Sequence, residues 1–595
     1  MPGDDAFGAT PTAAGVRFRV WAPNATAVAV AGEFNGWGRT PLAPGDGGVW
    51  TAEVAGVRAG EQYRYVLTTP DGELQRIDPY ARAVTSSAGR AIVYDEAAFD
   101  WGDAPYATPG WSELVIYELH VGTFNDLPGG AVGTLDDAAA KLPYLQDLGV
   151  NAVELLPVAE FATDSSWGYN PAVPFAVESA YGGPDALKRF VRAAHAAGIA
   201  VLLDVVCNHL GPGDLEFDLW QWDGTPPGCD GGVYFYGDWR QATDWGPRPD
   251  YGRDEVRRYL RDNALAWLGD ARADGLRFDA TAYIRCAHGS GDPADSLPDG
   301  WRLLREINEA IASTQPWKIA IAEDMRDEPA VTAPIAQGGA GFGAQWDARF
   351  LSTLRGMLTA GDDESRDMAA LAGALTHRFG EDAFARVVYT ESHDADSNGS
   401  TRVPTQIDPG DPTSVWAKKR STLGAALVLT APGIPMIFQG QEFLETHWFD
   451  DQHPPDWGNV DRHPGIVALY RDLIRLRRDW WDTTRGLRGQ GMQLHHVNAA
   501  DKLVAFHRWS SGGPRDDVVV LANCANRAYD AYTIGLPRGG RWRVRFNGDW
   551  AGYDPDFGGH GSFDLDAREE PRDGLPFSGD VGVGPYTAIV LSQDE

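Results

Sequence analysis

Three carboxylic acids of the chain, Asp279, Glu323 and Asp394, each lie at the end of a short apolar run that is typical of a buried strand. Arg277 precedes Asp279 by two positions, and because side chains alternate along a strand, the two side chains point the same way. By itself this pair is better explained as a structural ion pair. Three strand-end carboxylates together, in a sequence without a metal-type Cys/His motif, indicate acid–base chemistry instead.

Paired carboxyl groups are what the cleavage of a glycosidic bond requires. One must be ionised and nucleophilic, and the other must stay protonated so that it can release the leaving oxygen. Arg277 favours the first role for Asp279, because a neighbouring cation lowers the pKa of a carboxyl group. Glu323, near other carboxylates and apolar side chains, suits the second role, because such surroundings raise a carboxyl pKa. Asp394 would favour an oxocarbenium-like transition state.

Eight apolar runs, separated by amphipathic segments, are expected to position these residues. Hydrophobic strands that alternate with helices indicate a parallel sheet covered on both faces, and eight such units predict an α/β fold of the (β/α)8 barrel class. Barrel enzymes carry their reactive groups at the carboxyl ends of the strands, where this sequence also places Trp167, Tyr169, His209 and His393. The predicted strands are residues 114–121, 151–158, 200–206, 275–281, 318–323, 340–347, 386–394 and 434–442.

The barrel is predicted to span residues 109–485 and to lie between two β domains. Residues 1–108 contain short alternating strands with glycine-rich turns, which predict a β-sandwich module, and recurring strands in residues 486–595 predict a C-terminal all-β domain, also a sandwich. Residues 211–253 form a long connection rich in Gly, Pro and Trp, which predicts a small lobe inserted after the third strand, beside the mouth of the site. Its aromatic side chains could form the core of the lobe or contact sugar.

The composition limits the classes of partner. The 51 basic and 84 acidic residues give a formal net charge of −33, which argues against nucleic acid and anionic membranes, although an acidic surface also serves solubility alone. Residues 1–5 lack the basic and apolar regions of a signal peptide, and prolines interrupt the apolar run 423–438. Four scattered cysteines indicate no disulfide framework. We therefore predict a cytoplasmic protein without a membrane partner, and the sequence leaves the oligomeric state open.

Four motifs together resemble those of one family. They are residues 204–209 (DVVCNH), 275–279 (GLRFD), 322–324 (AED) and 392–394 (SHD). In this order and spacing they resemble the α-amylase superfamily, glycoside hydrolase family thirteen. The N-terminal segment is similar to the glycogen-binding-like module of branching enzymes, debranching enzymes and trehalohydrolases. The resemblance covers nearly the whole chain and is strongest over residues 115–445.

The resemblance implies roles for single residues. Asp279 would be the nucleophile, Glu323 the general acid/base and Asp394 the stabiliser of the transition state, with retention of configuration through a covalent glycosyl-enzyme. The other roles implied are orientation of the nucleophile by Arg277, sugar binding by Tyr169, His209, His393 and Trp167, and a structural role for Asp204. Amylases use the residue corresponding to Asn208 as a calcium ligand, but the sequence identifies no further ligands, so no metal or other cofactor is predicted.

The subfamily motifs point in two directions. Residues 117–124 are shared by branching enzymes and maltooligosyltrehalose trehalohydrolases, whereas residues 322–327 and 244–246 look closer to trehalohydrolases. Branching enzymes are the closer match at residues 167–171, 391–394 and 439–443. We predict a branching-enzyme-like transglycosylase that acts on an α-glucan or maltooligosaccharide. The alternatives are a hydrolase, either an α-amylase or a maltooligosyltrehalose trehalohydrolase, and a non-catalytic glucan-binding protein.

Overall fold

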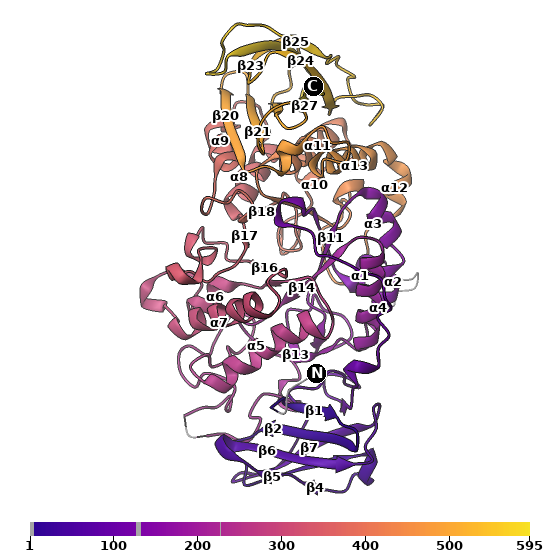
Figure 1. Cartoon of the computed structure of the whole chain (residues 1–595), viewed down its shortest axis with the longest axis vertical. Helices are drawn as coiled ribbons and strands as arrows, with labels where there is room; N and C mark the ends of the chain where they lie inside the picture. Colours follow the sequence, from indigo (N-terminus) through magenta and orange to yellow (C-terminus); the bar gives the residue numbers. More distant parts are fainter. Residues whose placement is uncertain (1–4, 126–131, 227) are drawn as a thin grey trace.

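The computed structural model describes residues 5–125, 132–226 and 228–595 of the chain. In Figure 1 an N-terminal β-sandwich lies at the bottom, a barrel with its helices in the middle, and a C-terminal β domain at the top. Residues 1–4, part of the N-terminal segment for which no signal peptide is predicted, lie outside the described residues. Among the described residues, no helix combines the length and the apolar character that crossing a membrane requires.

The central part is a closed barrel of eight parallel strands, which confirms the predicted fold class. Each predicted run contains one barrel strand, and every strand is buried, because helices cover the outside and side chains fill the inside. The strands follow one another around the barrel in chain order, and the last pairs with the first. They are β10 (Ile116–Leu119), β11 (Ala152–Leu155), β14 (Ala200–Val205), β15 (Gly275–Phe278), β16 (Ile319–Ala322), β17 (Ala344–Trp346), β18 (Arg386–Val388) and β19 (Ile434–Phe438).

The covering helices have the expected amphipathic pattern. In α4 (Gly183–Ala196), Leu187, Phe190 and Val191 are buried, as their helical spacing requires. The first helical segment, predicted as one helix, is instead α2 (Leu135–Ala139) and α3 (Leu142–Leu148), because Pro143 has no N–H with which to continue the earlier helix. The longer helices that follow are α5 (Asp254–Gly269), α7 (Pro298–Thr314), α8 (Ala348–Thr359), α11 (Val415–Thr430) and α13 (Pro464–Arg477).

Two sheets form the N-terminal sandwich, in agreement with the prediction. The first has the order β1-β2-β6-β5 and the second β4-β3-β7-β8, with β9 paired to β7. Alternate residues of the longer strands face the core between the sheets, including Phe18 and Tyr63, whose rings meet edge to face. The strands are β1 (Gly8–Pro11), β2 (Gly15–Trp21), β3 (Ala27–Gly32), β4 (Thr40–Pro41), β5 (Ala43–Pro44), β6 (Val49–Ala55), β7 (Gln62–Thr69), β8 (Gly72–Arg76) and β9 (Ala91–Ile92).

The inserted lobe is present, and most of its aromatic side chains are buried. It joins the N-terminal sandwich to the barrel: the Trp222 indole donates to the Trp21 carbonyl at 2.7 Å, and Asp223 accepts from the backbone and side chain of Asn24. These contacts explain the aromatic content of the lobe by packing. Trp239 and Trp245 differ, with 57% and 44% of their surface exposed.

A hairpin that the sequence did not predict follows the second barrel strand. It consists of β12 (Ala159–Phe161) and β13 (Pro171–Val177), which pair antiparallel. The connection between them, residues 162–170, contains Trp167 and Tyr169. The hairpin therefore supports both aromatic residues from a rigid base rather than leaving them on a free loop.

The C-terminal domain has one large sheet, ordered β20-β21-β22-β27-β24-β25, and a smaller pair, β23-β26. The four predicted strands correspond to β21 (Leu503–Trp509), β22 (Val518–Asn523), β24 (Gly540–Asn547) and β27 (Thr587–Ser592). The four that the sequence missed are at best partly apolar or very short: β20 (Gly491–Asn498), β23 (Tyr529–Leu536), β25 (Leu565–Ala567) and β26 (Phe577–Val583).

Helix α11 lies between the barrel and this domain. Every residue from Ala417 to Thr430 is buried, and strands β22 and β27 pack on the helix. Near its start, Lys418 pairs with Asp554 and Asp556 of the C-terminal domain, and Lys419 pairs with the fully buried Asp549. Buried apolar surface and ion pairs thus hold the two parts together.

Candidate active site

The structure brings all eight predicted site residues into one network of contacts at the carboxyl ends of the barrel strands. Arg277 lies on β15, Asp279 follows β15, Glu323 follows β16, and His393 and Asp394 follow β18. The remaining three come from neighbouring connections: His209 follows β14, and Trp167 and Tyr169 lie in the hairpin connection. Parallel pairing of consecutive strands explains the gathering, because it aligns their carboxyl ends.

Arg277 is the centre of this network. Its guanidinium is fully buried, and Nη1 donates to Asp204 Oδ2 at 2.6 Å and to Asp279 Oδ1 at 2.9 Å. Nη2 lies 3.1 Å from Glu323 Oε2, so one guanidinium contacts three carboxyl groups. The strand register accounts for the first contact, since Asp204 of β14 stands directly opposite Arg277 of β15. The Trp346 ring lies 4.5 Å from the guanidinium carbon and covers it.

Asp279 is held by donors on both carboxylate oxygens. Oδ1 accepts from Arg277, and Oδ2 accepts from the Asn208 amide at 2.6 Å. The Asp279 side chain is 12% exposed, so it is fixed in orientation and still reachable. Two fixed donors therefore aim the carboxylate.

Glu323 differs from Asp279 in its electrostatic surroundings. Burial, together with the nearby Asp279 and Asp394 carboxylates, outweighs the attraction of Arg277 and raises the pKa of Glu323 to about 8. Its Oε2 accepts the backbone N–H of Ala280 at 2.7 Å. Ala280 has a φ of 40°, in the left-handed region that a residue with a Cβ rarely adopts. This turn directs its N–H to Glu323 immediately after Asp279.

Asp394 is the exposed member of the three carboxylates, with 53% of its side chain accessible. Its Oδ2 lies 3.5 Å from His393 Nε2, and the other ring nitrogen of His393 contacts Glu118 Oε1 at 2.5 Å. Burial alone lowers the pKa of His393, but Asp394 and Glu118 outweigh it and raise the pKa to about 10. The histidine is therefore a cation between two carboxylates at neutral pH.

Aromatic side chains form one wall of the site. The Tyr169 ring stacks on His393 with 5.1 Å between ring centroids, and its hydroxyl donates to Asp204 Oδ2 at 2.6 Å. His209 Nε2 contacts the Tyr169 carbonyl oxygen at 2.7 Å. Trp167 stands edge-on to His393 and packs against Phe449. Tyr169 and Trp167 are each half-buried, which leaves part of each ring accessible.

Comparison with known proteins identifies the family. The description "alpha amylase, catalytic domain" matches residues 119–219 and 216–480, which is more than half of the chain. The chain belongs to the α-amylase family. Carbohydrate-binding module 48 (isoamylase N-terminal domain) matches residues 6–81, and the alpha-amylase C-terminal all-beta domain matches residues 494–594.

Similar proteins are known from several bacteria. The chain is 34% identical to a 1,4-alpha-glucan branching enzyme of Xanthomonas campestris pv. campestris, covering 90% of this chain and 75% of that one. It is 32% identical to a 1,4-alpha-glucan branching enzyme of Bacillus caldolyticus, and the match covers 97% of this chain and 87% of that one. Among solved structures, a candidate alpha amylase from Salmonella typhimurium is 25% identical with a TM-score of 0.74. The match covers 99% of this chain and 100% of that one. A pullulanase of Anoxybacillus sp. shares the fold, with a TM-score of 0.77 at 21% identity. The match covers 100% of this chain and 88% of the pullulanase chain.

Four further residues support the site, although none was predicted to act in catalysis or sugar binding. Asp204, expected to be structural, bonds Arg277 and Tyr169, and Trp346 covers the guanidinium. Glu118 holds His393 from 275 positions away in the chain, and Asn208 holds Asp279. The sequence contains one indication of the role of Glu118. It is a carboxylic acid inside an otherwise apolar strand, and a buried carboxylic acid needs a polar partner.

Asn208 is also the residue for which the family resemblance suggested calcium. Its amide nitrogen donates to Asp279, and its amide oxygen contacts His209 Nδ1. Both ends of the side chain thus have partners within the site.

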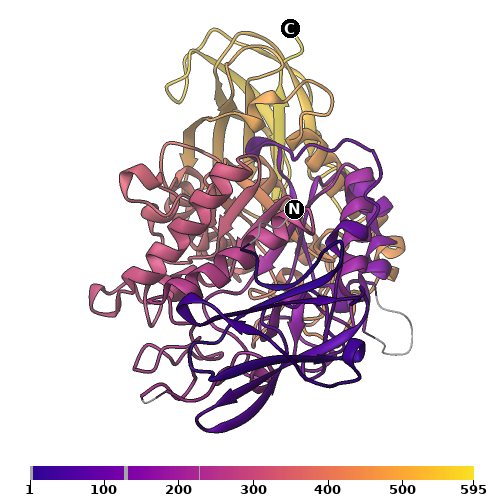
Figure 2. The same cartoon turned by 60° about the horizontal axis from the view of Figure 1, so that its bottom comes forward.

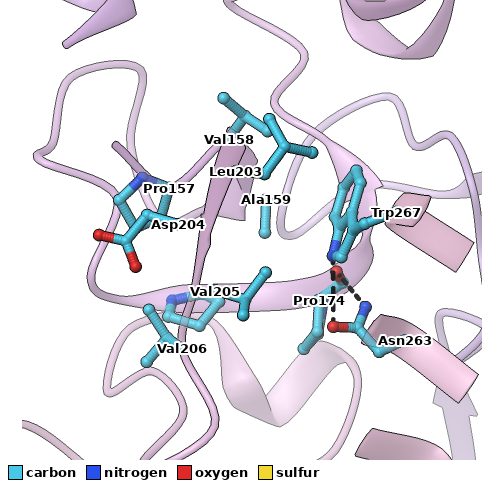
Figure 3. Close-up of a pocket in the computed structure, with 11 residues that line it drawn as sticks. Pro157, Val158, Ala159, Pro174, Leu203, Asp204, Val205, Val206, Asn263 and Trp267 are labelled. Carbon is cyan, nitrogen blue, oxygen red and sulfur yellow. Dashed lines mark hydrogen bonds between the residues drawn. The ribbon is translucent and has the colours of Figure 1, made fainter. Parts of the chain in front are cut away.

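The cavity drawn in Figure 3 is separate from this chemistry. It lies between β14, the start of the hairpin and helix α5, and its lining includes Val158, Leu203 and Trp267. Asp204 is the only residue of the site network among its lining residues, and its carboxylate lies on the opposite side of the picture from Trp267. We interpret this cavity as a packing gap beside the site.

Proposed function

We propose that this α-amylase-family protein is a 1,4-α-glucan branching enzyme, which cleaves an α-1,4 bond and transfers the fragment to a sugar hydroxyl. The observation that carries the proposal is the arrangement of two carboxyl groups, Asp279 and Glu323, on one guanidinium. Similarity to bacterial branching enzymes at 31–34% identity over at least 90% of the chain supports the choice of transfer.

In the first step an Asp279 oxygen attacks the anomeric carbon while the glycosidic C–O bond breaks. The leaving oxygen takes a proton from Glu323, and a covalent glycosyl-enzyme forms. Glu323 Oε2 already accepts from Ala280 and faces Arg277, so Oε1 is the oxygen that holds the transferable proton. In the second step the Glu323 carboxylate removes a proton from the acceptor hydroxyl, whose oxygen displaces Asp279. Two displacements retain the configuration.

The other residues bind and polarise the sugar. Asp394 is placed to stabilise the positive charge that develops on the ring, and the accessible face of Tyr169 provides a stacking surface. His393, a cation at neutral pH, donates a hydrogen bond to a sugar hydroxyl, while Trp167 supports His393 from the edge. The two ring nitrogens of His209 contact the Asn208 amide oxygen and the Tyr169 carbonyl oxygen, so His209 positions these two residues. Arg277 holds Asp279 in the orientation needed to attack the anomeric carbon.

The raised pKa of Glu323 predicts how activity depends on pH. The acid form donates the proton, and since the folded-state pKa is about 8, that form is present below this pH and is lost above it. We expect kcat/KM on amylose to fall tenfold for each pH unit above about 8. The measurement is a kcat/KM profile from pH 6 to 10, with the fold checked by circular dichroism at each end.

A substrate with a better leaving group distinguishes the effect of Glu323 ionisation on kcat/KM from the effect of other titrating groups. A maltooligosyl fluoride needs little proton donation on departure, so its kcat/KM should lose the alkaline decline. An alkaline decline of equal steepness for amylose and the fluoride would contradict the assignment of Glu323 as the acid.

The experiment that tests transfer is incubation with amylose, followed by proton NMR and a reducing-end assay. New α-1,6 signals with little reducing sugar are expected. A rise in reducing ends without α-1,6 signals would instead establish a hydrolase, the second candidate. That candidate draws support from the similarity along both whole chains to the candidate alpha amylase of Salmonella typhimurium. Trehalose released from a maltooligosyltrehalose would identify a trehalohydrolase.

A further inference from the structure

A second cluster of chemically competent side chains follows the last barrel strand. His447, Asp450 and His453 are spaced three residues apart, and each offers one ligand atom within 4.8 Å of the others. None of the three contacts Asp279, Glu323 or Asp394 through a hydrogen bond or ion pair among those the structure describes. The spacing His-x-x-Asp-x-x-His is a signal that a search for Cys/His motifs overlooks.

Two carboxylates, Glu445 and Asp450, hold the backbone of the segment that carries these residues. Glu445 accepts backbone N–H groups from Thr446, His447 and Asp456, which ties the two ends of the segment together. Asp450 Oδ1 accepts the backbone N–H groups of the second and third residues that follow it. The backbone under the cluster is therefore braced before any ligand binds.

The hydrogen bond of His447 determines which of its nitrogens is available. Nδ1 lies 2.7 Å from the Trp448 carbonyl oxygen, and because a carbonyl only accepts, Nδ1 carries the hydrogen. In the neutral ring, Nε2 then presents a lone pair. Donation of the other ring N–H to a backbone carbonyl is the arrangement that metal-binding histidines typically show.

The remaining two groups already face each other. His453 Nδ1 lies 2.9 and 2.8 Å from the two oxygens of Asp450. A divalent cation that replaced the shared proton would be bound by one imidazole and one carboxylate, with His447 as the third ligand. Both histidines are exposed, so an ion can enter from solvent and keep water in an open position.

We propose that His447, Asp450 and His453 form a binding site for a divalent transition metal, with Zn²⁺ as the best fit. Two imidazoles and one carboxylate suit Zn²⁺, which takes nitrogen and oxygen ligands in fours, three from protein and one from water. Ca²⁺ and Mg²⁺ prefer sites made of oxygen. The site lies beside Phe449, which packs on Trp167, so it is at the rim of the sugar-binding wall.

Metal binding can be tested without any assay of activity. After removal of metals with a chelator, titration with Co²⁺ should produce the intense visible bands of a four-coordinate ion, and Zn²⁺ should abolish them. Isothermal titration with Zn²⁺ should show one site per chain. Absence of saturable binding of one equivalent, or tighter binding of Ca²⁺ than of Zn²⁺, would overturn the proposal.

Single substitutions assign the ligands. His447→Gln, Asp450→Asn and His453→Gln should each weaken Zn²⁺ binding at least about tenfold. His288→Gln is the matched control, because His288 is an exposed histidine outside the cluster, and it should bind Zn²⁺ as the wild type does. Asn at position 450 keeps an oxygen that can accept the two backbone N–H groups, so the segment remains braced. Unchanged affinity in all three variants would refute the site.

Discussion

Replacing Asp279 by Asn should lower the turnover of α-glucan by about four orders of magnitude or more, because the amide cannot form the covalent glycosyl-enzyme. The fold should be retained. An amide oxygen can still accept from Arg277, and that guanidinium keeps its contacts with Asp204 and Glu323. The measurement is kcat on amylose by reducing-end and α-1,6 assays, beside a thermal melt followed by circular dichroism.

Asp566→Asn is the control for this substitution, since Asp566 is an exposed aspartate of the C-terminal domain and should leave kcat unchanged. Glu323→Gln extends the test. It should slow natural substrates strongly and a maltooligosyl fluoride much less, which separates loss of the acid from loss of the nucleophile. A folded Asp279→Asn variant with activity near that of the wild type would rule out the proposed nucleophile.

Lys419→Met should lower the free energy of unfolding by about 3–5 kcal/mol, because it leaves a buried carboxylate without its cation. Asp549, the partner, is fully buried, and the Lys419 side chain is 4% exposed. Burial lowers the pKa of Lys419, and the Asp549 carboxylate opposes this shift. Urea denaturation followed by tryptophan fluorescence measures the change.

Lys418→Met is the matched comparison on the preceding residue of the same helix. One of its partners, Asp556, is 56% exposed and can be hydrated after the change, so we expect a smaller loss of stability. If Lys419→Met and Lys418→Met unfolded at the same urea concentration as the wild type, ion pairs at this interface would contribute nothing to its stability.

The barrel could be predicted from the sequence because its signal is local. Each strand is an apolar run bounded by polar residues, and parallel strands place Asp279, Glu323 and Asp394 at one edge whatever their spacing along the chain. The division of the first helix at Pro143 was also readable in principle, since proline cannot continue a helix from the preceding turn.

The partners of the site residues could not be predicted in the same way. Glu118 meets His393 only because the closed barrel brings β10 and β18 to opposite flanks of β19. Asp204 meets Arg277 through the register of two strands, and a shift of one residue would turn its side chain to the other face. The same limit applies to the aromatic residues of the lobe. Trp222 and Trp245 are the same residue type, yet Trp222 is buried against the N-terminal sandwich and Trp245 is half exposed beside His209.

The burial of α11 from Ala417 to Thr430 constrains how this protein can be divided or recombined. A chain cut after residue 485 would present the apolar surface of α11 to solvent and leave Lys418 and Lys419 without acceptors. Such a fragment should aggregate on expression, and limited proteolysis of the intact protein should not release a stable barrel. Chimaeras between relatives should therefore exchange α11 and the C-terminal domain as one cassette.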